Sequence, residues 1–165
     1  MLRFLIRLEW FVGLVLVQAL ILNHVNIYGL FTPVVYIYFV MSLNTMTGRN
    51  GILLWAFFLG MAVDIMSNTP GLNASATLCV AYFRKLFIRS QTLRELGENF
   101  QPDSWTMGAG GFFRYTLIVT LVHSVLLGLL DAFSWENTGM VMVRAVSNSA
   151  ISTACIICID RMRRR

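Results

Sequence analysis

Long apolar runs separated by short polar breaks dominate this sequence and restrict it to folds that satisfy their own backbone groups. The 165-residue chain is 57% hydrophobic and 13% charged, whereas a soluble domain carries about 25% charged residues. About 20 apolar residues in a helix cross a hydrocarbon core about 30 Å thick. Only helices and closed barrels leave no backbone group unpaired in lipid. The sequence therefore predicts an all-α, multi-pass transmembrane helical bundle.

The polar breaks divide the chain, which we interpret as one integral membrane domain, into six spans. The first run has the basic start and apolar middle of a signal peptide, but apolar residues continue past the weak cleavage site at 17–19, which favours an uncleaved helix. Pro33 is expected in the first turn of the second span, where proline is tolerated. The predicted spans are residues 4–22, 27–46, 52–66, 72–88, 108–133 and 138–159, with a cytoplasmic loop at 89–106.

Basic residues mark one side of the predicted bundle. Eleven of the 13 Lys and Arg residues lie in the N-terminus, the 47–50 break, the C-terminal tail and the 89–106 loop with its flank at Arg84 and Lys85. The opposite breaks contain none: 23–32, 67–71 and 131–137. Because Lys and Arg are enriched in cytoplasmic loops, we expect both termini to be cytoplasmic. A nucleic-acid partner is not expected, since the basic residues form no groove or stripe.

The 89–106 loop is the longest polar segment. Thr92 and Glu95 have the spacing of a capping box, which predicts a short helix there. The loop is either a docking site for a cytoplasmic partner or a polar connector whose basic residues lie near anionic lipid.

Polar side chains inside the predicted spans are the candidate functional residues, because a charge at mid-helix costs about 2.5–3.5 kcal/mol on insertion scales. These are Asp64, Asn73, Arg114, His123, Arg144 and Asn148. Asp64 and Arg144 are expected about 12 and 9 Å below the outer face, so we predict that they approach each other, directly or through a water or Asn73. The alternative is that Arg144 extends to the headgroups while Asp64 caps the turn at 70–72 or the start of the fourth span.

No catalytic or metal-binding pattern is visible in the sequence. His123 and Ser124 are adjacent, so on a helix their side chains do not face each other. Neither a glycine-rich phosphate loop nor a zinc-protease motif occurs. Cys155 and Cys158 form a C-x-x-C without a His or acidic ligand beside it, which favours a packing role. We therefore predict no enzymatic activity, no cofactor and no metal.

Two interpretations of the amide and imidazole groups remain open. Asn73, His123 and Asn148 line a pocket, as in membrane transporters, or they form hydrogen bonds between helices. Small residues allow helices to approach closely. Three rows are expected to pack in this way: Ala56 with Gly60; Ala145 with Ser149 and Thr153; and Ala150 with Ala154 and Cys158.

Residues 31–85 carry a resemblance to a known family. Four pieces resemble the rod shape-determining protein MreD: Phe31-Thr32-Pro33, Thr47-Gly48-Arg49-Asn50, Gly60-Met61-Ala62-Val63-Asp64 and Asn68-Thr69-Pro70-Gly71-Leu72. The match covers about a third of the chain closely and the rest by span layout and length. It implies a non-enzymatic inner-membrane scaffold of the bacterial cell-elongation (rod) complex. The implied partners are an MreC-like bitopic membrane protein, the synthases of peptidoglycan synthesis and an actin-like MreB filament that controls cell shape.

The MreD family is also similar to the substrate-binding subunits of energy-coupling vitamin transporters. That similarity implies a helical fold with a central cavity and leaves a small-molecule-binding transporter subunit as the alternative function. Those subunits usually carry A-x-x-x-A in the first helix for docking their coupling partner. The first span here has Gly13 and Ala19 but no such pair, which argues against vitamin uptake. A shared fold would not decide function in any case.

The predicted topology places Asn99 in the cytoplasm and Asn137 outside. In membrane vesicles of known orientation, an impermeant thiol reagent should therefore label Asn99→Cys and Asn137→Cys from opposite sides. The unsubstituted chain is the control, because its three cysteines all lie in apolar segments. Labelling of both introduced cysteines from the outside would contradict the six-span topology.

Overall fold

The fold is all-helical in the part of the chain that the structure describes. A computed structural model describes residues 2–23, 32–91, 100–132 and 138–163. Its elements are α1 (Leu2–Leu16), a π-helical turn η1 (Val17–Leu22), α2 (Ile37–Ser42), α3 (Arg49–Ser67), α4 (Leu72–Gln91), α5 (Gly108–Ala132) and α6 (Thr138–Met162). The predicted fold class is thus confirmed at the level of a helical bundle. The capping box at 92–95 lies outside the described residues.

Among the residues that the structure describes, four helical stretches are long and apolar enough to cross a membrane. They are Phe4–Leu22, Arg49–Ser67, Gly108–Asp131 and Val141–Met162, and each overlaps a predicted span. They support the assignment of the chain as a membrane protein. α4 has similar length, but its sequence contains more polar and basic residues. The α2 helix has only six residues, which is too short to span a bilayer.

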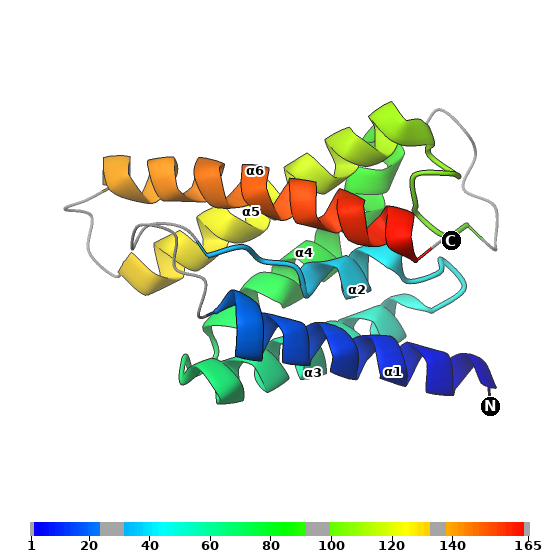
Figure 1. The fold of residues 1–165 in the computed structure, drawn as a ribbon, viewed down its shortest axis with the longest axis horizontal. Helices are drawn as coiled ribbons and strands as arrows, with labels where there is room; N and C mark the ends of the chain where they lie inside the picture. Colours follow the sequence, from blue (N-terminus) through cyan, green and yellow to red (C-terminus); the bar gives the residue numbers. More distant parts are fainter. Residues whose placement is uncertain (1, 24–31, 92–99, 133–137, 164–165) are drawn as a thin grey trace.

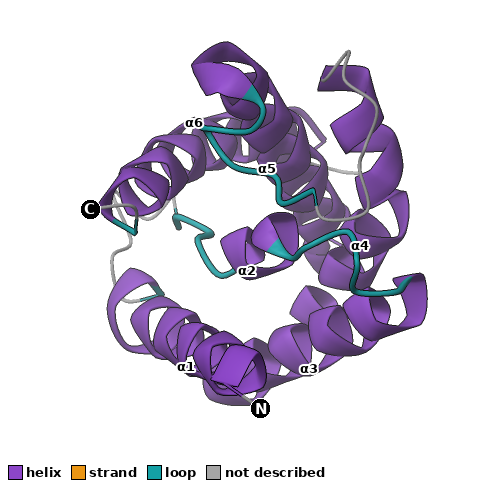
Figure 2. Ribbon diagram, turned by 90° about the vertical axis from the view of Figure 1, so that its right-hand side faces the viewer, coloured by secondary structure: helices purple, strands orange, loops and turns teal. Residues whose placement is uncertain are grey.

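The short helix α2 lies at the centre of the bundle. Figure 2 shows α1, α3, α4, α5 and α6 arranged around it. The long helices pack in chain order, α3 against α4, α4 against α5 and α5 against α6. Residues 33–43 are buried without exception. The hydrophobic core is therefore built around a segment that contains only a short helix.

The second predicted span, 27–46, is not one continuous helix in the residues that the structure describes. Residues 32–35 have no helical structure, the helix covers only Ile37–Ser42, and Leu43 is extended again with φ −61° and ψ 141°. Pro33 supplies the physical reason: it has no N–H to donate, and it disfavours the helical conformation in the residue before it. Pro33 therefore lies in an extended stretch before the helix and not in its first turn.

A tight turn joins α3 to α4 and brings the two helices together. Asn68 ends α3 in the left-handed conformation with φ 54°, and Gly71 has φ 82°, so the turn predicted at 67–71 is confirmed. Gly60 lies where α3 meets the start of α4, and a Cβ built there would be 2.4 Å from Ala74 Cα and 2.7 Å from Ala74 N. The close packing expected for Ala56 and Gly60 is present, since both residues are buried.

The two small-residue rows of α6 differ in their packing. The row of Ala145, Ser149 and Thr153 is buried, and Thr153 Oγ1 lies 3.0 Å from Thr120 Oγ1 of α5. The row of Ala150, Ala154 and Cys158 is exposed. The packing predicted for this second row is therefore wrong within this chain.

Gly60→Ala should destabilise the fold, because its methyl group would collide with backbone atoms that cannot rotate away. Overpacking of this kind costs about 1–3 kcal/mol. Gly13→Ala is the matched control: Gly13 is also helical, and nothing lies within 4 Å of a Cβ built there, so this change should be neutral or stabilising. Thermal unfolding in detergent micelles measures both. Equal stability of the two variants would contradict the close α3–α4 approach.

Candidate functional site

The central segment, residues 32–43, is the candidate site because its backbone N–H and C=O groups cannot all form hydrogen bonds within the segment. An extended stretch forms no hydrogen bonds within its own strand, and a short helix leaves its first N–H and last C=O groups free. Buried backbone groups without partners are costly. In membrane proteins, such irregular backbone is tolerated only where protein or a water-filled cavity surrounds it. The partners of this segment therefore reveal what the surrounding helices contribute.

Gln18 supplies partners from the first helix. Its Oε1 accepts a hydrogen bond from Val35 N at 2.8 Å, and its Nε2 donates to Pro33 O at 2.9 Å. Gln18 is 2% exposed and lies in η1, and π-helical turns often occur at functional positions. A single amide thus pairs one donor and one acceptor of the extended stretch, as a neighbouring β-strand would.

α6 supplies partners from the opposite side. Asn148 Oδ1 accepts from Thr32 N at 3.0 Å, and Ser152 Oγ accepts from Val34 N at 2.7 Å. Asn148 and Ser152 are four residues apart, so they share one face of the helix. The extended stretch is consequently held between polar groups of η1 and α6.

Arg84 and Tyr115 hold the other end of the central segment. Arg84 Nη2 donates to the carbonyl oxygens of Met41, at 3.2 Å, and of Leu43. The Tyr115 hydroxyl donates to Met41 O at 3.4 Å. These carbonyls lie at the C-terminal end of α2, where the helix dipole favours a nearby cation. Arg84 is 3% exposed, so it lies inside the bundle and not, as predicted, in the basic flank of the 89–106 loop.

Tyr36 connects the central segment to α4 and α5. Its hydroxyl donates to Asn73 Oδ1 at 2.9 Å and lies 2.9 Å from His123 Nε2. The Tyr36 hydroxyl has one hydrogen, which it donates to Asn73. His123 Nε2 is therefore assigned as the donor in the contact between His123 and Tyr36. Thr77 Oγ1 lies 3.4 Å from the same nitrogen. His123 Nδ1 is buried without a hydrogen-bond partner in the described structure.

Asp64 caps the start of α4 and does not pair with Arg144. Its Oδ1 accepts from Asn73 N, Asn73 Nδ2 and Thr69 Oγ1 at 2.9–3.0 Å, and its Oδ2 accepts from Ala74 N at 2.9 Å. A carboxylate suits this position because the first N–H groups of a helix are free and carry partial positive charge. Arg144 is exposed. The predicted approach of Asp64 and Arg144 is therefore wrong, and the alternative in which Asp64 caps α4 is correct.

The remaining predicted residues divide into bonded and exposed groups. Asn73 and His123 meet at Tyr36, and Asn148 binds the central segment, so the three amide and imidazole groups form hydrogen bonds between elements. Arg114 is exposed on α5. Cys155 is half-buried and Cys158 exposed, both as free thiols. In the described residues, no group of three or more His, Cys, Asp or Glu side chains is placed to hold a metal ion.

Sequence reasoning missed several residues that hold the segment: Gln18, Tyr36, Arg84 and Tyr115. Two signals were available. A glutamine within a long apolar run needs a buried partner, and a proline within a predicted span signals unpaired backbone. The other three look like ordinary helix residues, and only the fold brings them to the segment.

Asp160 fastens the basic end of the bundle. Its Oδ1 accepts from the Tyr38 hydroxyl at 2.9 Å, and its Oδ2 accepts from the backbone N and the hydroxyl of Ser104. Thr45 N also donates to Phe100 O at 2.9 Å. The end of α6, the central segment and the turn before α5 are thus joined here.

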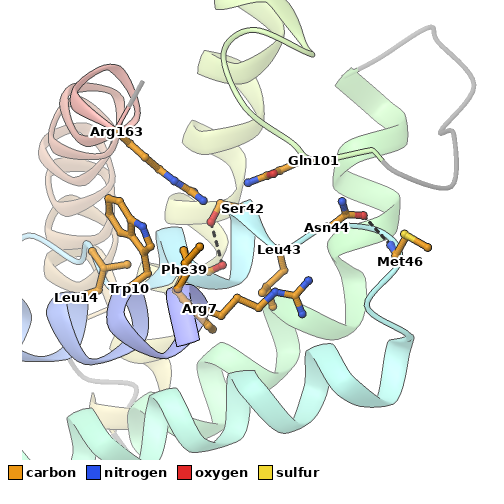
Figure 3. Close-up of a pocket in the computed structure, with 11 residues that line it drawn as sticks. Arg7, Trp10, Leu14, Phe39, Ser42, Leu43, Asn44, Met46, Gln101 and Arg163 are labelled. Carbon is orange, nitrogen blue, oxygen red and sulfur yellow. Dashed lines mark hydrogen bonds between the residues drawn. The ribbon is translucent and has the colours of Figure 1, made fainter. Parts of the chain in front are cut away.

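A cavity of about 580 Å³ opens beside this junction. Arg7 and Trp10 of α1, Phe39 of the central segment, Gln101 and Arg163 are among its lining residues. Figure 3 shows Arg163 and Gln101 reaching toward Ser42 from opposite sides. The cavity is therefore at the end of the bundle where basic residues gather. It is separate from the hydrogen-bonded group of Tyr36, Asn73 and His123.

Comparisons with protein-family models, with curated proteins and with solved structures gave no match for this chain.

Asp64→Asn should destabilise the protein, because an amide nitrogen in place of one oxygen leaves a buried N–H donor of α4 or Thr69 unpaired, at a cost of about 1–3 kcal/mol. Arg144→Gln should change the free energy of unfolding by no more than about 0.5 kcal/mol, as is usual at exposed positions. Thermal and denaturant unfolding of both variants and of the double variant measures these effects. Since the residues are not in contact, the double variant should show the sum of the single effects. A double variant much more stable than that sum would indicate an Asp64–Arg144 pair.

Proposed function

We propose that this chain is a non-enzymatic membrane scaffold of the bacterial cell-elongation (rod) complex, similar to MreD. Its proposed partner is an MreC-like bitopic membrane protein, through which it is connected to cell-wall synthases and to an MreB-like filament. The observation that carries the proposal is the MreD-like sequence of residues 31–85. The same region contains the central segment, all of α3, the turn that leads into α4 and the first part of α4.

The positions of the MreD-like residues support a role of these residues in fixing the fold of the protein. Pro33 lies in the extended stretch, Gly60 allows α3 to approach α4, and Asp64 caps α4. Gly71 provides a positive φ in the connecting turn. Each residue has a structural reason for its identity, which is what a protein that acts by presenting a fixed surface requires.

The transporter alternative has less support. It would use Asn73, His123 and Asn148 to bind a small molecule near the bilayer midplane. Asn73 and His123 instead contact the Tyr36 hydroxyl, and Asn148 accepts from Thr32 N. A ligand at these groups would have to replace hydrogen bonds that hold the central segment.

The proposed topology has six crossings in the inner membrane with both termini in the cytoplasm. The central segment forms part of the second crossing. Its start is bonded to Asn148 in the first half of α6, and residues just beyond its end are bonded to Phe100, near the start of α5. Since α5 and α6 are antiparallel neighbours in the proposed topology, these contacts support a segment that runs from one side of the bundle to the other.

Loss of this protein should make rod-shaped cells round while leaving the uptake of small nutrients intact. Expression of the wild-type chain or of Arg144→Gln should restore the rod shape, and a bitopic membrane protein should co-purify with the chain in mild detergent. Microscopy, growth without vitamins and identification of the co-purified protein measure these outcomes. Vitamin auxotrophy with normal cell shape would contradict the proposal and favour the transporter alternative.

A further inference from the structure

The cavity at the basic end combines a charged mouth with an apolar interior. Arg7 of α1 and Arg163, one residue beyond the end of α6, bring two guanidinium groups to its lining. Its apolar lining includes Ile6, Leu14 and Phe39. Leu14 lies seven residues beyond Arg7 on the same helix, about 10 Å at 1.5 Å per residue. The cavity thus changes from cationic to hydrophobic along α1.

No acidic side chain is among the described residues that line this cavity. The nearest acidic side chain in sequence to Arg163 is that of Asp160, which accepts hydrogen bonds from Tyr38 and Ser104. The Arg163 guanidinium interacts with the Tyr38 hydroxyl, and its guanidinium carbon lies 4.8 Å from the centre of the Trp10 ring, a stacking contact that positions the charge without neutralising it. In the described residues, neither Arg7 nor the Gln101 side chain has a hydrogen-bond or ion-pair partner. The described lining thus offers guanidinium and amide donors to an anion.

We propose that this cavity binds the phosphate headgroup of an anionic phospholipid, with the beginning of an acyl chain along its apolar lining. Planar guanidinium groups bind phosphate oxygens through paired hydrogen bonds, and Gln101 adds an amide donor. Basic pockets between transmembrane helices on the cytoplasmic side are suited to anionic headgroups. The tryptophan between the two zones matches the preference of this residue for the membrane interface.

A lipid explains the lining better than free phosphate does. Inorganic phosphate would use the arginines but would leave Ile6, Leu14 and Phe39 beside a strongly hydrated ion. A zwitterionic lipid would bring its choline cation close to Arg7 and Arg163. The mixed lining therefore selects a lipid whose headgroup has a net negative charge. This inference is independent of the proposed role in cell elongation.

The test is lipid binding by the purified full-length chain in nanodiscs and by native mass spectrometry. Wild-type protein offered equal amounts of phosphatidylglycerol and phosphatidylcholine should retain phosphatidylglycerol. The double variant Arg7→Gln/Arg163→Gln should retain at least about tenfold less of it, since hydrogen bonds to charged groups are the strong ones. Arg89→Gln is the matched control, because Arg89 is exposed on α4 and does not line the cavity, and it should bind like the wild type.

A charge-preserving variant keeps the test informative if the double variant folds poorly. Arg7→Lys/Arg163→Lys keeps both charges but loses the planar groups, so binding should fall less than with glutamine and more than with Arg89→Gln. Equal retention of both lipids by the wild type, or equal loss in Arg89→Gln and the double glutamine variant, would overturn the proposal. Displacement of phosphatidylglycerol by millimolar inorganic phosphate would also overturn it, because the site would then be one for free phosphate.

Discussion

The hydrogen bonds that surround the central segment are the constraint on which the rest of this structure depends. Residues 32–43 place extended backbone and a six-residue helix in the middle of a helical bundle, where unpaired N–H and C=O groups are costly. Gln18, Arg84 and Asn148 supply several of the missing partners from three different helices. Each of these helices must therefore keep its rotation about its own axis and its position along that axis relative to the segment.

This requirement explains why polar side chains lie inside the bundle: they bind the central segment or the elements that hold it. Asn73 and His123 meet at Tyr36, which belongs to the central segment, and Asp64 orders the start of the helix that carries Asn73. At the other end, Asp160 binds Tyr38 of the same segment. The result is a bundle fixed from its centre, with its cavity at the basic end.

The sequence was sufficient for the class of fold and for most helix positions, because apolar run length and turn residues are local signals. It was insufficient for the second span, since the cost of Pro33 depends on whether neighbouring helices offer partners. The predicted approach of Asp64 and Arg144 is wrong for a related reason: the depth of a residue along a helix does not fix its rotation around the helix axis. Asp64 lies beside the turn that follows its own helix, and local capping groups were closer than any distant arginine.

Amide hydrogen exchange at Val34 and Val35 tests the central claim most directly, because both N–H groups donate to side chains and not to backbone. In micelles, we expect these amides to exchange as slowly as buried amides of α4. In Gln18→Met, exchange should accelerate at Val35 first, because only this amide loses its acceptor directly. Rapid exchange of both amides in the wild-type protein, at the rate of an exposed loop, would contradict a central segment held by the surrounding helices.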